Sequence, residues 1–238
     1  MSGRRIYLNI RHKISQLLNP ALCLSCAMPI PSSDYLCSYC QQALPRVVNA
    51  CNRCGLPNKA SGPVCPACQQ NPPRWQKMIA PLIYQQTVRQ LIHDYKFDEQ
   101  LYIGQALLTH IYTAYNSPSI EALIPVPLHK SRLLERGFNQ SEELARVLSR
   151  LLDIPFDRHC LQRIRPTLPQ SGLSLNKRQK NLMQAFSYNP PLPGYKSVAI
   201  IDDVITTGST MDEICKRLHL AGVRHVEVWS LCRALRHE

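Results

Sequence analysis

The chain contains 238 residues, of which 45% are hydrophobic, and its formal net charge at pH 7 is +12. This length allows one large domain or two smaller ones, and the apolar fraction is sufficient for the core of a globular protein. No apolar stretch approaches the roughly 20 residues of a membrane-spanning helix, and Arg11, His12 and Lys13 interrupt the apolar positions near the N-terminus. We therefore expect no membrane span, no secretory signal and a cytoplasmic location.

The positive charge is concentrated in two parts of the chain. Residues 1–78 carry nine Lys or Arg against one acidic residue, a net charge of +8, and residues 129–180 carry eleven against five, a net charge of +6. A basic surface favours polyanionic partners, because binding phosphate groups releases condensed counterions. Nucleic acid is one such partner, and a solvated basic surface is the alternative.

Apolar residues recur at helical spacing before the first cysteine, at Ile6, Ile10, Ile14, Leu17 and Leu18. This spacing predicts an amphipathic basic helix over residues 1–20. We expect this helix to pack on the protein rather than on a membrane.

Eight of the 11 cysteines form four C-x-x-C pairs, at Cys23 and Cys26, Cys37 and Cys40, Cys51 and Cys54, and Cys65 and Cys68. Two thiolates separated by two residues can face one tetrahedral ion through a tight turn, and two such pairs complete a four-sulfur zinc site. Disulfides are disfavoured, because cytosolic thiols are kept reduced. A redox C-x-x-C would normally occur once, within an α/β unit. The pairs therefore predict two structural Zn²⁺ sites.

An internal repeat indicates which pairs share an ion. The shift that carries Cys23 onto Cys51 also superposes Cys37 on Cys65, Pro29 on Pro57 and Gln41 on Gln69. Each repeat then has its own four ligands, Cys23/Cys26/Cys37/Cys40 in one and Cys51/Cys54/Cys65/Cys68 in the other. We predict this sequential pairing in a double zinc ribbon over residues 21–73, and a cross-braced pairing is the alternative.

After a Pro-rich linker at residues 71–74, a second domain is predicted over residues 78–238. Helical patterns cover residues 88–95, 102–115, 144–151 and 210–220, and apolar strand-like runs cover 122–126, 198–201 and 225–231. Strands that alternate with helices predict an α/β fold with a mainly parallel sheet and helices on both faces. Ligands of such sheets bind at the carboxyl ends of the strands, so the functional loops should follow Val126 and Ile201.

The loop after the second of these strands carries the clearest chemistry. An acidic pair is followed by a glycine-containing hydroxyl loop at a helix start, with Asp202, Asp203, Thr206, Thr207, Gly208, Ser209 and Thr210 as its residues. Backbone amides and hydroxyls at a helix start bind phosphate, and glycine permits a close approach. Carboxylates are acceptors only and suit the two hydroxyls of a ribose. The run predicts a site for a phosphorylated sugar, and a strand-turn-helix with a solvated acid pair is the alternative.

The sequence has neither a P-loop pattern nor G-x-G-x-x-G. The run instead resembles the signature of type I phosphoribosyltransferases. That resemblance implies a type I phosphoribosyltransferase-like fold, in which the acidic pair holds the ribose diol of 5-phosphoribosyl 1-diphosphate (PRPP), bound with Mg²⁺, and the loop holds its 5-phosphate.

Further segments are similar to the ComF/GntX family, whose members are linked to natural competence and the use of external DNA. They are Ile124-Pro-Val-Pro127, Arg136-Gly-Phe-Asn-Gln140, and Gln170, Arg178, Asn181, Ala185 and Phe186, beside the double zinc ribbon. The resemblance covers nearly the whole chain. It implies that the loop after Val126 meets the diphosphate, with Lys130, Arg132 and Arg136 as candidate contacts.

The stretch from Arg165 to Arg178 has little apolar periodicity and contains Pro166, Pro169 and Gly172. This composition suits a lid that brings Arg178 or Lys180 over the site. A disordered surface loop has the same composition and is the alternative for this stretch. For Lys130, Arg132 and Arg136, the alternative is that they lie in a solvated loop.

Two functions follow from these patterns. The first is a PRPP-binding protein that acts in DNA uptake and natural transformation, handles single-stranded DNA and meets proteins of the DNA-uptake machinery. The second is an active phosphoribosyltransferase that transfers phosphoribosyl to an unidentified amine or base, and the sequence leaves open whether turnover occurs. Near the ribbons the aromatics are Tyr35, Tyr39 and Trp75. Packing of both tyrosines beside the zinc ligands is favoured over base stacking.

The repeat leads to a direct prediction about metal content. Elemental analysis of the purified protein should find two zinc ions per chain, because each repeat supplies a complete set of four thiolates. One ion or none would contradict the assignment of four ligands to each repeat.

Overall fold

The structure is a computed structural model, and it describes residues 21–31, 34–97, 101–115, 120–165, 184–191 and 194–235. The helix expected over residues 1–20 and the lid candidates Arg178 and Lys180 lie outside these ranges. The chain divides into two compact units, residues 1–44 and residues 45–238, and each is described by itself.

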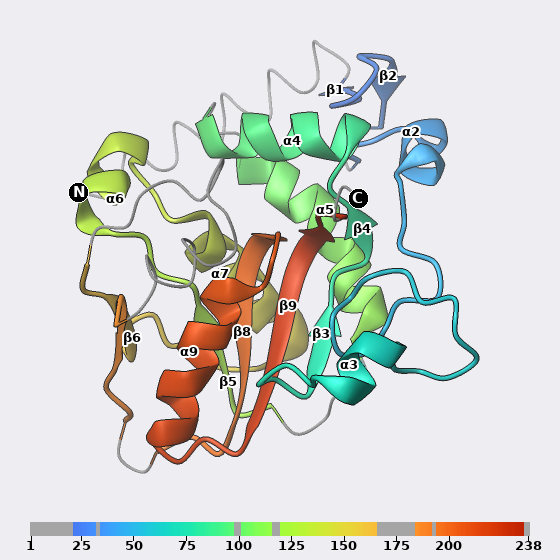
Figure 1. The fold of residues 1–238 in the computed structure, drawn as a ribbon. Helices are drawn as coiled ribbons and strands as arrows, with labels where there is room; N and C mark the ends of the chain where they lie inside the picture. The colour runs from blue at the N-terminus through green and yellow to red at the C-terminus, as the bar shows by residue number, and fades with distance from the viewer. Residues whose placement is uncertain are drawn as a thin grey trace, which may run out of the picture. The chain divides into compact units, whose positions relative to one another are not determined.

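The elements follow one another along the chain as Figure 1 shows. They are β1 (Ala21–Leu22), β2 (Pro29–Ile30), α2 (Ser38–Ala43), α3 (Pro66–Gln70), β3 (Lys77–Ile79), β4 (Leu82–Ile83), α4 (Gln86–Phe97), α5 (Leu101–Ala114), β5 (Ala122–Pro125), α6 (Lys130–Arg136), α7 (Gln140–Leu152), β6 (Leu161–Arg163), β7 (Phe186–Tyr188), β8 (Ser197–Ile205), α9 (Ser209–Leu220) and β9 (His225–Arg233). In the part of the chain that the structure describes, no helix is long and apolar enough to cross a membrane.

The first unit is a small ribbon built around cysteines. Strands β1 and β2 pair antiparallel, with Ala21 opposite Ile30. Helix α2 begins directly after Cys37, whose sulfur accepts the backbone N–H of Cys40 at 3.4 Å. A thiol thus takes the place of the usual hydroxyl or carboxylate cap.

A parallel sheet forms the centre of the second unit. Its strand order is β3-β9-β8-β5. Strand β4 also pairs with β9, at residues of β9 that follow those paired with β3. All of these pairings are parallel. The mainly parallel sheet that the sequence predicts is therefore confirmed. Strands β3 and β4 were not predicted, because two or three residues are too few to show a periodic pattern.

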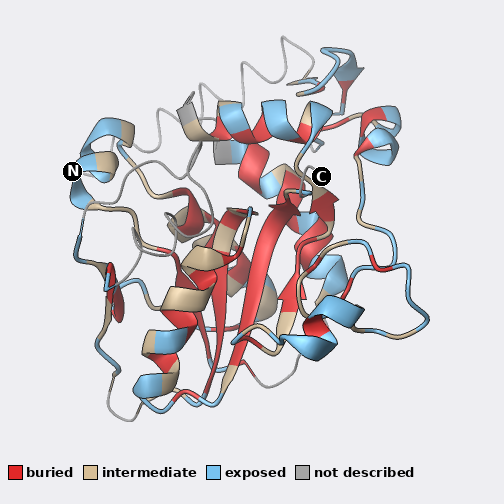
Figure 2. Ribbon diagram, in the orientation of Figure 1, coloured by how far each residue is buried: buried red, intermediate tan, exposed pale blue. Residues whose placement is uncertain are grey.

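Helices cover both faces of this sheet (Figure 1). Helices α5 and α7 contact β5, β8 and β9 on one face. On the other face, Met211, Ile214 and Leu218 of α9 join a buried cluster with Ile200 of β8 and Val228 of β9. Burial along the strands is nearly continuous (Figure 2), as expected for a sheet covered on both sides.

Several boundaries differ from those that the sequence predicts, and three of the differences lie beside the loops that follow β5 and β8. Strand β8 does not end at residue 201 but continues to 205, because its backbone stays paired with β9 through Ile205. Helix α9 starts one residue early, at Ser209. The loop after Val126 contains the helix α6, which ends at Gly137, a residue in the left-handed conformation.

The second cysteine ribbon belongs to the same compact unit as the sheet. The backbone N–H of Met78, in the edge strand β3, donates to Asn52 in the ribbon at 2.8 Å. The side chain of Met78 also lies against Gly55, where an added Cβ would be 2.8 Å from its sulfur. The ribbon formed by the third and fourth cysteine pairs is thus packed directly on the α/β domain.

Candidate functional site

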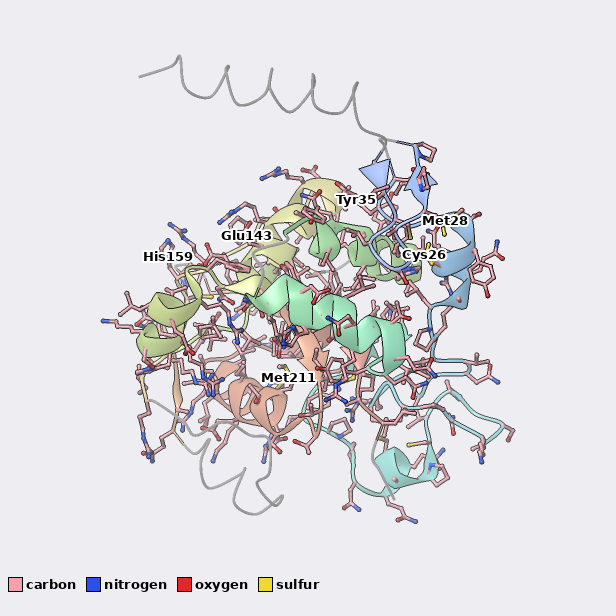
Figure 3. The ribbon with its side chains drawn as sticks, turned by 90° about the horizontal axis from the view of Figure 1, so that it is seen from above. Cys26, Met28, Tyr35, Glu143, His159 and Met211 are labelled. Carbon is pink, nitrogen blue, oxygen red and sulfur yellow. The ribbon has the colours of Figure 1, made fainter. Side chains whose placement is uncertain are left out.

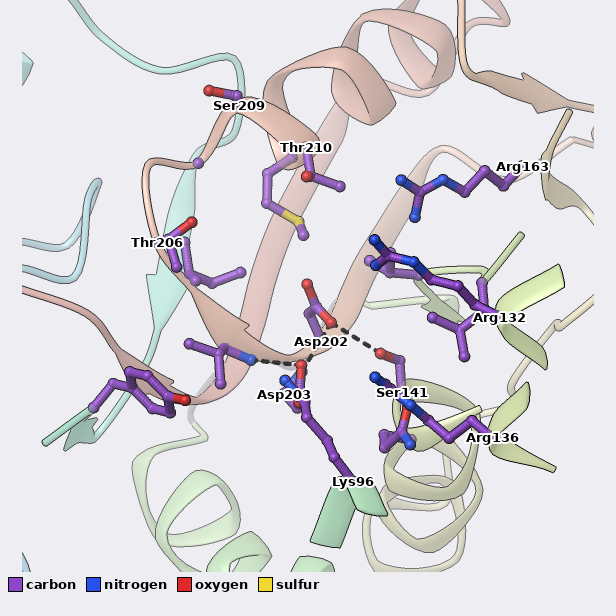
Figure 4. A pocket seen from close by; sticks show the side chains of 18 residues that line it. Lys96, Arg132, Arg136, Ser141, Arg163, Asp202, Asp203, Thr206, Ser209 and Thr210 are labelled. Carbon is purple, nitrogen blue, oxygen red and sulfur yellow. Dashed lines mark hydrogen bonds and ion pairs between the residues drawn. The ribbon is translucent and has the colours of Figure 1, made fainter. Parts of the chain in front are cut away.

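A pocket of about 400 Å³ opens where β8 ends and α9 begins (Figure 4). Besides this loop, α4, the segment after β5, α6, α7 and β6 contribute to its walls. It is lined by Tyr84, Lys96, Val126, Leu128, Arg132, Arg136, Gln140, Ser141, Arg163, Asp202, Asp203, Val204, Ile205, Thr206, Gly208, Ser209, Thr210 and Met211. The pocket therefore gathers both of the loops that the sequence singled out.

The acidic pair lies on the floor of the pocket and is held by direct contacts. Asp202 accepts hydrogen bonds from the Ser141 hydroxyl and from the backbone N–H of Asp203, each at 2.9 Å. The Asp203 carboxylate lies 2.5 Å from the Lys96 ammonium and is 7% exposed. The two carboxylates thus have different partners, a hydroxyl for one and a cation for the other.

These surroundings raise the pKa of Asp202. The pKa is raised to about 7, first by burial and then by the neighbouring Asp203 charge, while Lys96 and Ser141 act in the opposite direction. Burial alone would lower the pKa of Lys96, but the Asp203 carboxylate outweighs it and the pKa is raised. At neutral pH Asp202 is therefore poised between its two protonation states, and Lys96 stays charged.

Local structure explains how Lys96 and Ser141 reach the acidic pair. Lys96 is in the last turn of α4, next to Tyr95, whose hydroxyl donates to the Gln140 carbonyl at 2.9 Å. Asn139 caps α7 by accepting the N–H of Ser141 at 3.2 Å, and its amide donates to the carbonyl of Val126 at 3.1 Å. Helices α4 and α7 are thereby anchored around the pocket.

The hydroxyl loop begins α9 and depends on one glycine. Gly208 caps the helix with φ +85°, and an added Cβ would lie 3.0 Å from the ring of Trp75. Both facts require glycine at this position. The first turn of α9 leaves backbone N–H groups without intrahelical partners, which is the usual anion-binding feature of a helix start. Thr206, Ser209 and Thr210 line the pocket, while the Thr207 hydroxyl pairs with that of Ser209 at 2.9 Å.

Three arginines enter the pocket from the side opposite Thr206 (Figure 4). Arg136 donates to the Gln140 side chain at 2.9 Å. Burial lowers the pKa of Arg136 and that of Arg163, the like charge of Arg132 lowers both further, and the acidic pair acts in the opposite direction. Mutual repulsion in a partly buried site favours an anion between these groups. Lys130, the remaining diphosphate candidate, is exposed and does not line the pocket.

The charges of the pocket do not cancel. Among the described residues that line it, four are cationic and two are acidic. The cations are Lys96, Arg132, Arg136 and Arg163, and the acids are Asp202 and Asp203. The arrangement suits a ligand with anionic groups at two ends and hydroxyls between them.

The eight cysteines that the sequence predicts to bind zinc form two separate groups of four sulfurs. Cys23, Cys26, Cys37 and Cys40 make one group, and Cys51, Cys54, Cys65 and Cys68 make the other. Within each, the sulfurs lie within 4.8 Å of one another, with 3.8 Å between Cys26 and Cys37 and 3.9 Å between Cys54 and Cys65. A zinc tetrahedron with bonds of about 2.3 Å requires sulfurs about 3.8 Å apart. The groups fit structural Zn²⁺ in the grouping that the repeat predicts.

Backbone N–H groups help the first thiol of each group to ionise. Burial raises the pKa of Cys23, but hydrogen bonds from backbone N–H groups outweigh it and bring the pKa to about 6. Cys51 shows the same balance, with a pKa of about 7. The equivalent donors, the N–H groups of Cys37 and Cys65, are each 3.3 Å from the acceptor sulfur. The repeat therefore reproduces the environment of the first ligand as well as its spacing.

One aromatic side chain near the ribbons, Tyr39, is placed differently from what the sequence favours. Figure 3 shows Cys26, Met28 and Tyr35 in the first ribbon. Tyr39 is 79% exposed, so it does not pack beside the zinc ligands. Trp75 is 5% exposed, which excludes it as a stacking platform for bases.

Comparison with known proteins identifies the family. Residues 14–69 match the model of the double zinc ribbon domain. The chain is 38% identical over 223 residues to "Competence protein F" of Haemophilus influenzae, and the aligned region covers 90% of each chain. The chain belongs to the ComF family.

Two further ComF relatives extend the comparison. "DNA utilization protein YhgH" of Escherichia coli K12 is 37% identical over 224 residues, or 91% of this chain and 98% of the relative. "Competence protein ComFC" of Streptococcus pneumoniae is 28% identical over 160 residues, or 65% of this chain and 67% of the relative.

Among the pocket residues of this ComF protein that sequence reasoning missed are three with a charge or a direct contact to the acidic pair. Lys96, Ser141 and Arg163 come from α4, α7 and β6, none of which carries a phosphate or sugar motif. Ser141 directly follows the quoted segment that ends at Gln140, so extending that segment by one residue would have found it. Lys96 and Arg163 offered no such signal.

The ion pair predicts how the acidic pair of this ComF protein titrates. Replacing Lys96 with methionine removes a cation that favours the Asp202 carboxylate, so the pKa of Asp202 should rise from about 7 to about 8. Carboxyl ¹³C NMR titration measures this change. Lys130→Met, at the exposed start of α6, is the control and should leave the titration unchanged. An unchanged or lowered pKa in Lys96→Met would contradict the assigned contact.

Proposed function

We propose that this ComF protein binds PRPP in the pocket at the end of β8 and acts in DNA uptake and natural transformation by handling single-stranded DNA in the cytosol. One observation carries the proposal for the pocket. An acceptor-only acid pair lies between a helix start that is suited to phosphate and three converging arginines.

The chemistry of PRPP matches this order of groups. Its ribose diol would donate to Asp202 and Asp203, and its 5-phosphate would accept from the amides and hydroxyls of residues 206–210. Its diphosphate would face Arg132, Arg136 and Arg163, of which Arg163 was not among the predicted candidates. Mg²⁺ would arrive with the diphosphate and neutralise part of its charge.

The names of the relatives support the DNA part of the proposal. They are a competence protein, a DNA utilization protein and a second competence protein. The net charge of +6 on residues 129–180 gives an electrostatic basis for binding a polyanionic strand. A protein in this role would meet proteins of the DNA-uptake machinery. The reduced thiols that zinc ligation requires are consistent with the cytosol.

A second function, turnover of PRPP, is favoured by the arginines. In that reaction the bond between the anomeric carbon and the diphosphate breaks, an amine or base forms a bond to that carbon, and the acceptor loses a proton. The arginines would stabilise the departing diphosphate. The acceptor is unidentified, and the enzyme would be a phosphoribosyltransferase.

Binding of PRPP is tested by calorimetric titration with Mg²⁺ at pH 6 and pH 8. Since Asp202 has a pKa of about 7 and must be ionised to accept the diol, we expect binding to be about tenfold weaker at pH 6. The double variant Asp202→Asn/Asp203→Asn should weaken binding at pH 8 by at least tenfold.

Asp153→Asn is the matched control, because Asp153 is exposed and asparagine tolerates its left-handed backbone. Failure of the wild-type protein to bind PRPP at either pH would refute the proposal for the pocket. Release of diphosphate above the level of the double variant, in a screen of amines and bases, would establish the second function.

Binding of single-stranded DNA is tested with a fluorescent oligonucleotide at several salt concentrations. We expect the affinity to fall steeply with salt, because phosphate contacts release counterions. Tyr39→Ala should weaken binding by about tenfold, since an exposed aromatic side chain stacks on bases. Tyr112→Ala is the control, because Tyr112 is exposed on α5 but lies outside both basic stretches of the chain. A flat salt response would remove the DNA-handling role.

A further inference from the structure

A single buried arginine joins the second cysteine ribbon to the phosphate loop. The Nε of Arg233 donates to the carbonyl of Cys54 at 2.8 Å. One of its terminal nitrogens donates to the carbonyl of Ile205 at 2.8 Å and to that of Thr206. Arg233 is 2% exposed, so these bonds are shielded from water. One guanidinium therefore holds a zinc-ligand residue and the start of the loop together.

A second connection runs parallel to the first. The Nε1 of Trp75 donates to the carbonyl of Arg53 at 2.5 Å, and the guanidinium of Arg53 donates to the carbonyl of Trp75 at 2.6 Å. The other end of the Trp75 ring lies against Gly208, in the loop. Residues 53 and 54 form the turn of the third C-x-x-C pair. Both residues of this turn thus contact a side chain that also touches residues 205–208.

The position of this turn depends on metal. Cys51 and Cys54 are the ligands of this pair, and the sulfurs of their group are spaced for one zinc ion. The ribbon contains few large apolar side chains, so a bound ion acts together with the contacts to β3 and Trp75 in fixing its backbone. When the ion is bound, the carbonyls of Arg53 and Cys54 are held in place. When it is lost, the acceptors for Trp75 and Arg233 are no longer fixed.

We propose that the metal at the second cysteine group sets the conformation of the phosphate loop, with Arg233 as the positioning residue that couples the two. The proposal rests on the proposed function, because it assumes that residues 206–210 are the segment that binds a phosphoryl group. Coupling of binding is reciprocal, so PRPP also strengthens the retention of this zinc by the same factor.

The fork of an arginine is needed for this coupling. In the parallel register of β8 and β9, Arg233 lies opposite Ile205, so its side chain starts beside the loop. Separate nitrogens then reach the ribbon on one side and the loop on the other. Lysine carries the same charge on a single nitrogen and cannot occupy both positions.

The first experiment compares one ligand from each cysteine group. Cys54→Ser removes a ligand of the second zinc but keeps the carbonyl that Arg233 contacts. Cys26→Ser removes a ligand of the first zinc and is the matched control, because that group belongs to the other compact unit. Each variant should hold one zinc ion. We expect hydrogen exchange of amides 206–210 to be about tenfold faster in Cys54→Ser and within twofold of wild type in Cys26→Ser.

The second experiment breaks the link and keeps the metal. Arg233→Lys should retain both zinc ions, show the same faster exchange of the loop, and bind PRPP about tenfold more weakly. PRPP should slow the loss of the second zinc to a chelator in Cys26→Ser but not in Arg233→Lys. Trp75→Phe, which removes the Nε1 donor and the part of the ring that lies against Gly208, should show changes in the same direction and decides the matter if Arg233→Lys does not fold.

The outcomes separate this inference from the proposed function. Unchanged loop exchange in Cys54→Ser, or loss of protection across the whole sheet, would overturn the coupling, since the effect would then be absent or global. If wild-type protein does not bind PRPP while the exchange differences are present, the proposed function fails and the connection between ribbon and loop stands.

Discussion

Parallel pairing of β8 with β9 determines where the functional groups lie. Its register sets Asp202 opposite Ser230 and Ile205 opposite Arg233. Both strands are buried along most of their length, so a shift of one residue would exchange the side chains that face the two helical layers. The core therefore holds the register, and the register places the acid pair, the start of the phosphate loop and the arginine beside it.

The electrostatics of the pocket follow from the presence of several charged side chains in a space where water is partly excluded. Lys96 compensates one carboxylate directly, and Asp202 is left with a hydroxyl partner and a raised pKa. On the other side, burial and the like charge of Arg132 lower the pKa of Arg136 and that of Arg163. Such a site is incompletely compensated by its own residues, and this is the condition under which an anionic ligand gains most from binding.

The two cysteine groups are alike in chemistry and differ in their surroundings. Each has four sulfurs at zinc spacing and the same donation of a backbone N–H to its first ligand. The first group belongs to the small unit that ends at Leu44, whereas the second is packed into the unit that contains the sheet. Through Arg233, the metal site of the second ribbon is thus connected to the phosphate loop of the α/β domain.

The sequence by itself determined the features that depend on local pattern. These are the two sets of thiolates, the parallel sheet, and the acid pair with its hydroxyl loop, because spacing, repetition and apolar runs are visible within a short window. Only the tertiary structure decided that Lys96 pairs with Asp203, that Ser141 and Arg163 join the pocket, and that Arg233 bridges ribbon and loop. These contacts join residues far apart in the chain, and the packing of helices and ribbon on the sheet creates them without leaving a periodic signal.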